Sequence, residues 1–381
     1  MNFVISMSPR VHRIAVSVFF FIAGLTFSTW ASRIPDIKEK LHLSEAGLGS
    51  VLFALPVGLM ASLFLTGWLI SRLGSRKVVV GGAIVYSGVL ILLAVAATTF
   101  QLVLGLFLFG LFANFLNISM NTQAVGVEGK YGRSIMASFH GLWSLACFAG
   151  AGFGTFFVSA GISPVLHFAL ISIASGLLVF SSYRSTLPVD VHEKNKQPIF
   201  VLPDKHILVL GLIAFCCMVC EGAMADWSGV YFQKVVETPA AYTTLGYAAF
   251  TATMATGRFV GDWLVTKFGV KRMLQMSGTV IASGLLLAVF FPNLITATMG
   301  FLLVGFGVSS VVPIAYGLAG KSSTMSPSMA LSAVSTIGFL GFLVGPPLIG
   351  FIAEASSLRF SFALIALLGL GTSILAGKVR Q

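Results

Sequence analysis

The chain alternates long apolar stretches with short polar turns, and within each stretch the apolar residues run continuously instead of every second position. A helix that crosses a bilayer needs about 20 apolar residues, and continuous stretches exclude a transmembrane β-barrel, whose strands alternate. The twelve predicted spans lie near residues 11–31, 46–70, 78–98, 101–125, 136–159, 162–182, 207–231, 240–265, 273–291, 294–318, 329–353 and 357–377. The pattern therefore predicts an all-α membrane protein of twelve transmembrane helices.

The first apolar stretch follows basic residues, as the core of a secretory signal peptide would. It is long, however, and it is not followed by a convincing small-residue cleavage site. We therefore expect a first transmembrane helix here.

One long polar stretch, at residues 184–206, lies midway along the chain and predicts a cytoplasmic linker between domains at 1–183 and 207–381. The two domains resemble each other in sequence. Trp30 matches Trp227 at an offset of 197, and the turn at Gly74-Ser-Arg-Lys matches Gly269-Val-Lys-Arg at an offset of 195. The repeat indicates a duplication that yields two pseudo-symmetric six-helix bundles. This architecture is typical of transporters that bind their substrate between the bundles, near the membrane midplane.

Composition agrees with the pattern, since 57% of residues are hydrophobic, 9% are charged and the mean hydropathy is +0.97. The net charge of +11 would suggest nucleic-acid binding in a soluble protein. Membrane topology explains it better. With both termini cytoplasmic, seventeen Lys and Arg residues face the cytoplasm and five face the other side, while Arg258 lies inside a span. We expect no nucleic-acid partner.

The turn after the second span, Gly67-Trp-Leu-Ile-Ser-Arg-Leu-Gly-Ser-Arg-Lys77, resembles the Gly-x-x-x-Asp-Arg-x-Gly-Arg-Arg motif of the major facilitator superfamily. The resemblance covers essentially the whole chain. Four further segments are similar to the YbjJ-type inner-membrane proteins, a branch near the fucose-permease-like sugar transporters: Trp30-Ala-Ser-Arg-Ile-Pro, Glu221-Gly-Ala-Met-Ala-Asp-Trp-Ser, Gly257-Arg-Phe-Val-Gly-Asp262 and Gly341-Phe-Leu-Val-Gly-Pro-Pro-Leu-Ile-Gly350.

The resemblance implies a major facilitator fold in a bacterial inner membrane. The chain departs from the motif at Ser71, where the family has the Asp that helps to close the cytoplasmic face. The basic residues of the turn keep two interpretations, gating or simple positive-inside topology. These residues are Arg72, Arg76 and Lys77.

Charged residues inside spans are costly, about 2.5 to 3.5 kcal/mol each, and so they mark candidate sites. We predict Glu221 as the proton-binding or substrate-binding carboxylate, the alternative being a protonated side chain that holds a neighbouring helix. Asp226 and Arg33 are predicted to pair as an outer gate, or else each anchors its helix at the membrane interface. Arg258 and Asp262, four residues apart, predict a structural pair at a helix end, with substrate contact as the alternative.

Amide and aromatic side chains extend the predicted substrate site. Asn114, Asn117 and Asn121 form a stripe on one helix that could hydrogen-bond hydroxyl groups, or could join neighbouring helices. His140 could relay protons or pack. Trp143 and Tyr247 could stack on a sugar-like ring or belong to the aromatic belts of the membrane interfaces.

Other chemistry is weakly represented. The four cysteines lie inside spans, and the Cys217-Met-Val-Cys220 spacing is explained better by packing than by a metal. We expect no cofactor or metal. Phosphate loops and nucleophile-base arrangements are missing from the sequence, which argues against an enzyme. A receptor is disfavoured because no sensor domain is evident.

The predicted function is therefore secondary transport of a small polar, hydroxyl-bearing solute by a monomer in the lipid bilayer, coupled to protons. Proton-driven export of drugs or metabolites is the alternative.

Overall fold

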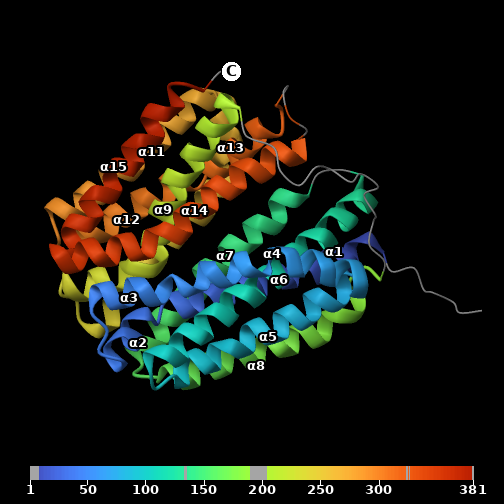
Figure 1. Cartoon of the computed structure of the whole chain (residues 1–381), viewed down its shortest axis with the longest axis horizontal. Coiled ribbons are helices and arrows are strands. Elements are labelled where there is room, and N and C mark those ends of the chain that lie inside the picture. Colours follow the sequence, from blue (N-terminus) through green and yellow to red (C-terminus); the bar gives the residue numbers. More distant parts are fainter. Residues whose placement is uncertain (1–7, 133–134, 189–203, 323–324, 326, 380–381) are drawn as a thin grey trace, which may run out of the picture. The chain divides into compact units, whose positions relative to one another are not determined.

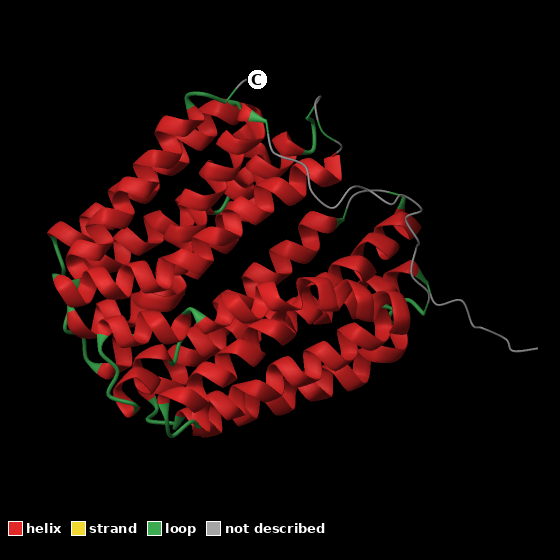
Figure 2. Ribbon diagram, in the orientation of Figure 1, coloured by secondary structure: helices red, strands yellow, loops and turns green. Residues whose placement is uncertain are grey.

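A computed structural model describes residues 8–132, 135–188, 204–322, 325 and 327–379. Every regular element in these ranges is a helix, and the helices are joined by short loops (Figure 2). The predicted linker at 184–206 lies mostly outside the described residues. Figure 1 labels the α-helices except α10, and along the chain they are α1 (Pro9–Ala31), α2 (Ile34–Lys40), α3 (Glu45–Leu52), α4 (Ala54–Leu73), α5 (Ser75–Val95), α6 (Thr99–Tyr131), α7 (Met136–Ser159), α8 (Pro164–Ser182), α9 (Lys205–Lys234), α10 (Leu245–Phe268), α11 (Val270–Phe290), α12 (Leu294–Val308), α13 (Val311–Ala319), α14 (Pro327–Ala355) and α15 (Leu358–Ala376). Two 3₁₀ turns, Tyr183–Ser185 and Ala240–Tyr242, complete the list.

Each predicted span coincides with one helix or with two consecutive helices. Eleven helical regions among the described residues are long and apolar enough to cross a membrane. The predicted span at 240–265 is also a helix, α10, of 24 residues. It is less apolar than the others because Arg258, Asp262 and Lys267 lie along it.

The sequence pattern did not predict three details. The predicted span at 46–70 is divided at Phe53 into α3 and α4, and the span at 294–318 is divided at Ser309 and Ser310 into α12 and α13. The short helix α2 begins with Pro35 in its first turn, where a proline has no hydrogen bond to lose. Apolar periodicity cannot reveal the two breaks because the residues on either side of each are equally apolar, and α2 is too short and too polar to give an apolar pattern.

The described residues divide into two compact units. The first consists of the described residues within 1–30, 54–153 and 162–194, and the second consists of those within 31–53, 154–161 and 195–381. Two segments of the first sequence half thus pack with the second half. The predicted division into 1–183 and 207–381 stays a prediction.

The predicted duplication has a counterpart in local geometry. Gly74 and Gly269, which precede α5 and α11, have nearly the same backbone angles, φ 82° with ψ 151° and φ 79° with ψ 155°. These left-handed φ values favour glycine. In the turn of α4 before Gly74, the Arg72 guanidinium lies 5.2 Å from the Trp68 ring, and in α10 the Lys267 ammonium lies 5.0 Å from the Trp263 ring.

The two halves also share a helix crossing. A Cβ added at Gly110 of α6 would overlap the carbonyl oxygen of Leu55 in α4, and one at Gly305 of α12 would overlap that of Phe250 in α10. Each glycine therefore permits the same close helix contact. The offset of 195 residues at these positions agrees with the predicted repeat.

Candidate functional site

The second unit contains an ion pair in the middle of two long helices. Glu221 is on α9, about 24 Å along the helix axis from Lys205. Its Oε1 lies 3.8 Å from Nη2 of Arg258, which is near the middle of α10. The two side chains are 15% and 19% exposed. Both charges are therefore largely removed from solvent, and each partly compensates the other.

Two further helices bring hydroxyl groups to this ion pair. Tyr316 of α13 lies within electrostatic range of Glu221, and its hydroxyl hydrogen-bonds the side chain of Ser335 in α14. All four residues are partly accessible rather than fully buried. We call Glu221, Arg258, Tyr316 and Ser335 the central cluster.

The break between α12 and α13 lies beside the central cluster. Ser309 and Ser310 interrupt the helix there, and the Ser309 hydroxyl donates to the carbonyl of Phe306 at 2.6 Å. A Cβ at Gly257 of α10 would meet the Ser309 side chain, so the residue before Arg258 packs directly against the break. A helix break deep in a membrane protein is typical of ligand sites, because it exposes backbone groups to a cavity.

The geometry of the ion pair permits exchange of partners. At 3.8 Å the attraction amounts to about 4 kcal/mol for an effective dielectric constant of about 20. A guanidinium has five N–H donors and stays charged, whereas a carboxylate can take up a proton. Protonation of Glu221 would abolish this attraction and leave Arg258 donors available to another acceptor.

The predicted outer-gate residues both belong to the second unit. The Arg33 guanidinium lies 3.4 Å from Asp36 of α2, with side-chain exposures of 2% and 35%. Burial lowers the pKa of Arg33 and raises the pKa of Asp36, and the attraction between the two groups partly offsets each change. Asp226 lies on α9, half-buried, five residues beyond Glu221. The predicted contact between Arg33 and Asp226 stays a prediction.

The predicted asparagine stripe divides into two environments. Asn114 is buried, and its Nδ2 donates to the Ser62 hydroxyl of α4 at 2.8 Å. It therefore makes the contact between helices that was the alternative to substrate binding. Asn117 is exposed and Asn121 is half-buried; Nδ2 of Asn121 donates to the Asn117 carbonyl at 2.8 Å.

The other predicted binding residues have aromatic neighbours. The His140 ring meets the edge of Phe20 at 5.3 Å, and Trp143 stacks on Phe27 at 6.5 Å. Tyr247 is 3% exposed and lies 6.4 Å from the ring of Phe250. Roles in proton relay or substrate stacking stay predictions for these residues.

The basic turn after α4 is in the first unit. Arg76 donates to the Thr186 hydroxyl at 2.9 Å and to the Arg184 carbonyl at 2.8 Å, so it joins the start of α5 to the segment after α8. Lys77 is exposed, and Arg72 covers Trp68 as described above. The proposed gating roles of these residues remain untested. The side chain of Asp262 lies outside the described part, so its predicted pairing with Arg258 also stays a prediction.

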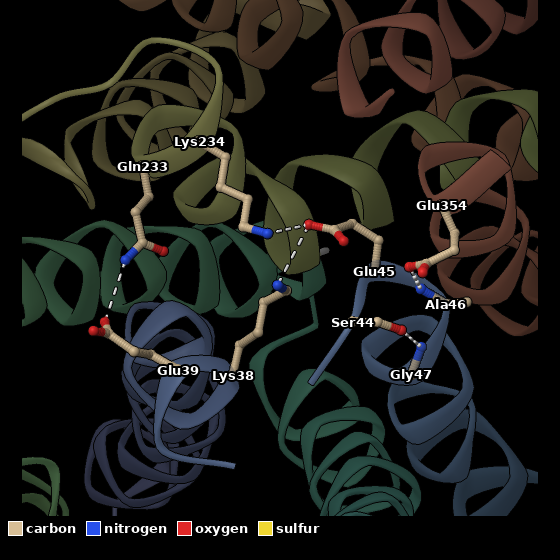
Figure 3. Close-up of polar contacts among 9 residues, drawn as sticks. All are labelled: Lys38, Glu39, Ser44, Glu45, Ala46, Gly47, Gln233, Lys234 and Glu354. Atoms are coloured by element: carbon tan, nitrogen blue, oxygen red, sulfur yellow. Dashed lines mark hydrogen bonds and ion pairs between the residues drawn. The ribbon is translucent and has the colours of Figure 1, made fainter. Parts of the chain in front are cut away.

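The structure contains a second cluster of charged side chains, which the sequence did not predict. In Figure 3, Oε1 of Glu45 in α3 contacts two ammonium groups, Lys38 of α2 at 3.4 Å and Lys234 at the end of α9. Nearby, Gln233 donates to Glu39 at 3.4 Å, and a carboxylate oxygen of Glu354 in α14 accepts from the backbone N–H of Ala46 at 3.3 Å. We call these contacts the Glu45 network.

The Glu45 network joins segments that are far apart in sequence. Lys38 is 5% exposed, and burial is the main cause that lowers its pKa. Glu45 offsets the repulsion between Lys38 and Lys234. Close packing accompanies the charges, since a Cβ at Gly229 of α9 would lie 2.7 Å from the Pro35 ring of α2. The sequence indicated the two lysines but not their common partner, since Lys38 and Lys234 are among the five basic residues on the side that topology leaves poor in positive charge.

Comparison with known proteins agrees with this architecture. Residues 16–327 and 239–380 match the Major Facilitator Superfamily. The chain is 33% identical over 385 residues to an uncharacterized MFS-type transporter of Yersinia pestis, covering 98% of this chain and 100% of that protein.

Solved structures show the same fold. A mutant of the nucleoside transporter NupG superposes with a TM-score of 0.78 at 13% identity, covering 97% of this chain and 100% of that one. A mutant of the Escherichia coli fucose:proton symporter FucP gives 0.66 at 16% identity, covering 98% and 100%.

The chain belongs to the Major Facilitator Superfamily. It is therefore a multi-pass membrane transporter with the major facilitator fold, and not an enzyme. Transporters of this family bind small-molecule substrates within the lipid bilayer. The narrower resemblance to the YbjJ-type proteins stays a prediction.

Proposed function

We propose that this transporter moves a small polar, hydroxyl-bearing solute by alternating access and couples its movement to protons through Glu221. The observation that carries the proposal is the ion pair of Glu221 and Arg258 in the middle of α9 and α10. A charge pair at membrane depth is costly to keep, and function is the usual reason for it. Sugars and other polyols present hydroxyl groups that match the donors and acceptors of the central cluster.

The proposed cycle uses exchange of partners at Arg258. When Glu221 is ionised, its carboxylate pairs with the guanidinium of Arg258. When Glu221 takes up a proton, the guanidinium can donate to a solute oxygen, while the hydroxyls of Tyr316 and Ser335 provide further hydrogen bonds. Loss of the proton restores the ion pair and displaces the solute. Binding of proton and solute would thus favour each other, as coupling requires.

The Glu45 network is proposed to close the outer end of the transport path. Opening that end would require Lys38 and Lys234 to leave Glu45, and Gln233 to leave Glu39. Because few basic residues occupy this side of the predicted topology, we assign it to the periplasm of a bacterial inner membrane, with both termini cytoplasmic. We further propose that residues 1–183 and 207–381 are the two moving halves, that 184–206 is their linker, and that one chain suffices for transport.

Thermal-shift screening tests the proposal. Purified wild type, Glu221→Gln and the matched control Glu237→Gln, which changes an exposed loop carboxylate, are screened at acidic and neutral pH. The panel contains sugars, polyols, nucleosides, amino acids and lipophilic cations. A ligand that binds the folded protein stabilises it against unfolding, and the stabilisation grows as the ligand concentration rises above its Kd. We expect a hydroxyl-bearing solute to stabilise wild type and Glu237→Gln more at acidic pH, and Glu221→Gln equally at both.

Two outcomes would contradict the proposal. Stabilisation of wild type by lipophilic cations alone would replace it with proton-driven export. Unchanged pH dependence in Glu221→Gln would remove Glu221 from the coupling mechanism.

A further inference from the structure

A groove of about 750 Å³ lies on the first unit, beside the N-terminal half of α1. The α1 residues that line it are Arg10, Arg13, Ile14, Ser17, Val18 and Phe21. Their spacing of three and four residues places them on one face of the helix. The opposite face is buried, with Val16 and Phe19 inaccessible to solvent. One face of α1 thus packs in the unit while the other borders an open groove.

One end of the groove is basic. Arg10 is exposed and Arg13 is half-buried. Nη2 of Arg13 donates to the Ser138 hydroxyl at 3.1 Å, and its guanidinium lies 5.5 Å from the centre of the Tyr131 ring. These contacts fix the orientation of Arg13 and use only part of its five donors. Neither arginine is in an ion pair within the described part of the chain.

Beyond its basic end, the groove is mostly apolar, with Ser17 as the polar residue of α1 in this part. Ile14, Val18 and Phe21 line it from α1, while Leu142 of α7 and Leu178 of α8 face them. Arg10 and Phe21 are separated by about 16 Å along the helix axis, which matches one leaflet of a hydrocarbon core about 30 Å thick. Since α1 is a membrane span that begins at Pro9, the basic end lies where lipid headgroups are and the apolar part lies at acyl-chain depth.

We propose that this α1 groove binds an anionic phospholipid, with its phosphate between Arg10 and Arg13 and an acyl chain along Ile14, Val18 and Phe21. The positive charge of Arg10 and Arg13 favours a phosphate group. The length of the apolar lining favours a ligand with an acyl chain over a free ion. A water-soluble anion would leave the apolar lining without a partner. The groove belongs to the first unit and the central cluster to the second, and the proposed site does not depend on the proposed transport mechanism.

Native mass spectrometry of the purified full chain tests the site with phosphatidylglycerol as the probe. Arg10→Gln with Arg13→Gln removes the basic end, and Lys271→Gln with Arg272→Gln removes the same charge at the start of α11. Val18→Trp fills the groove without changing charge, and Leu367→Trp is its control at an exposed apolar position. Phosphatidylcholine with the same chains and inorganic phosphate are the comparison ligands.

We expect one phosphatidylglycerol per wild-type chain. Its affinity should fall about 30-fold in the Arg10 and Arg13 variant, because each basic residue near an anionic headgroup contributes about fivefold. It should also fall in Val18→Trp, and both control variants should bind as wild type does. Phosphatidylcholine should bind weakly.

Equal losses in both charge variants would refute the site in favour of general electrostatic attraction. Full binding by Val18→Trp, or inorganic phosphate binding that competes with the lipid, would refute the role of the acyl chain. Size-exclusion profiles identify a misfolded variant, and Val18→Trp still tests the groove if the arginine variant fails to fold.

Discussion

Replacing Glu221 with glutamine keeps the size of the side chain and removes its charge, which leaves Arg258 at membrane depth without that carboxylate. The two atoms of the pair are 3.8 Å apart, and their attraction is about 4 kcal/mol at an effective dielectric constant of about 20. Removing one partner of a fully buried pair costs about 3 to 5 kcal/mol. Because these side chains are 15% and 19% exposed, water screens part of the charge. We expect Glu221→Gln to cost about 2 kcal/mol of unfolding free energy.

A double-mutant cycle separates this effect from general damage to the site. Glu221→Gln, Arg258→Gln and the double variant are unfolded in mixed micelles of mild and denaturing detergent. The double variant removes both charges of the pair, so its loss should be smaller than the sum of the two single losses by about 2 kcal/mol. If the loss of the double variant equals the sum of the two single losses within about 0.5 kcal/mol, the pairing is refuted, because independent sites are additive.

Three further predictions concern the surrounding structure. Glu45→Gln should open the predicted outer end. A cysteine introduced by Thr243→Cys reports on it, because Thr243 is 7% exposed and its carbonyl lies beside Gly229 of α9; with Glu45→Gln this cysteine should react faster with a membrane-impermeant maleimide. An unchanged rate would contradict the gating role of the Glu45 network. Asn114→Ala should cost about 1 kcal/mol in the same unfolding assay because it removes a buried hydrogen bond between helices, while the Ser62 hydroxyl keeps its bond to the Leu59 carbonyl. Asn117→Ala, at an exposed position, should cost less than about 0.5 kcal/mol, and equal losses would contradict their different environments. Burial raises the pKa of Asp36, so the folded state binds the carboxyl proton more tightly than the unfolded state does. The contribution of Asp36 to stability is therefore full below the ordinary carboxyl pKa, and it falls as the pH rises through the raised pKa. Asp36→Asn should flatten that part of the stability curve, and an unchanged slope would contradict the shift.

The spans could be predicted from sequence because lipid imposes one strong constraint on every crossing segment, a continuous apolar run. The turn at Gly74 and its repeat at Gly269 were visible for a related reason, since left-handed backbone angles restrict the residue type. The breaks at Phe53 and Ser309 lie inside apolar runs and change no periodicity.

Partners in the site were harder to predict. Helical spacing suggested Asp262 for Arg258, and that pairing stays a prediction. Spacing gave no sign of Glu221, which lies on another helix, 3.8 Å from Arg258. Helix packing decides such pairs, and a single sequence contains no direct signal for it. The Glu45 network was missed for the same reason: Lys38 and Lys234 entered the topology count as separate charges, and their common carboxylate is on a third helix.

The central claim is that Glu221 couples solute movement to protons, and proton flux measures this directly. Wild type and Glu221→Gln are reconstituted in proteoliposomes that contain a pH-sensitive dye, and an outside excess of the solute identified by thermal shift is applied. The account predicts that solute entry acidifies the lumen of wild-type vesicles, and that Glu221→Gln exchanges solute without acidification. Acidification at the wild-type rate in Glu221→Gln would contradict it.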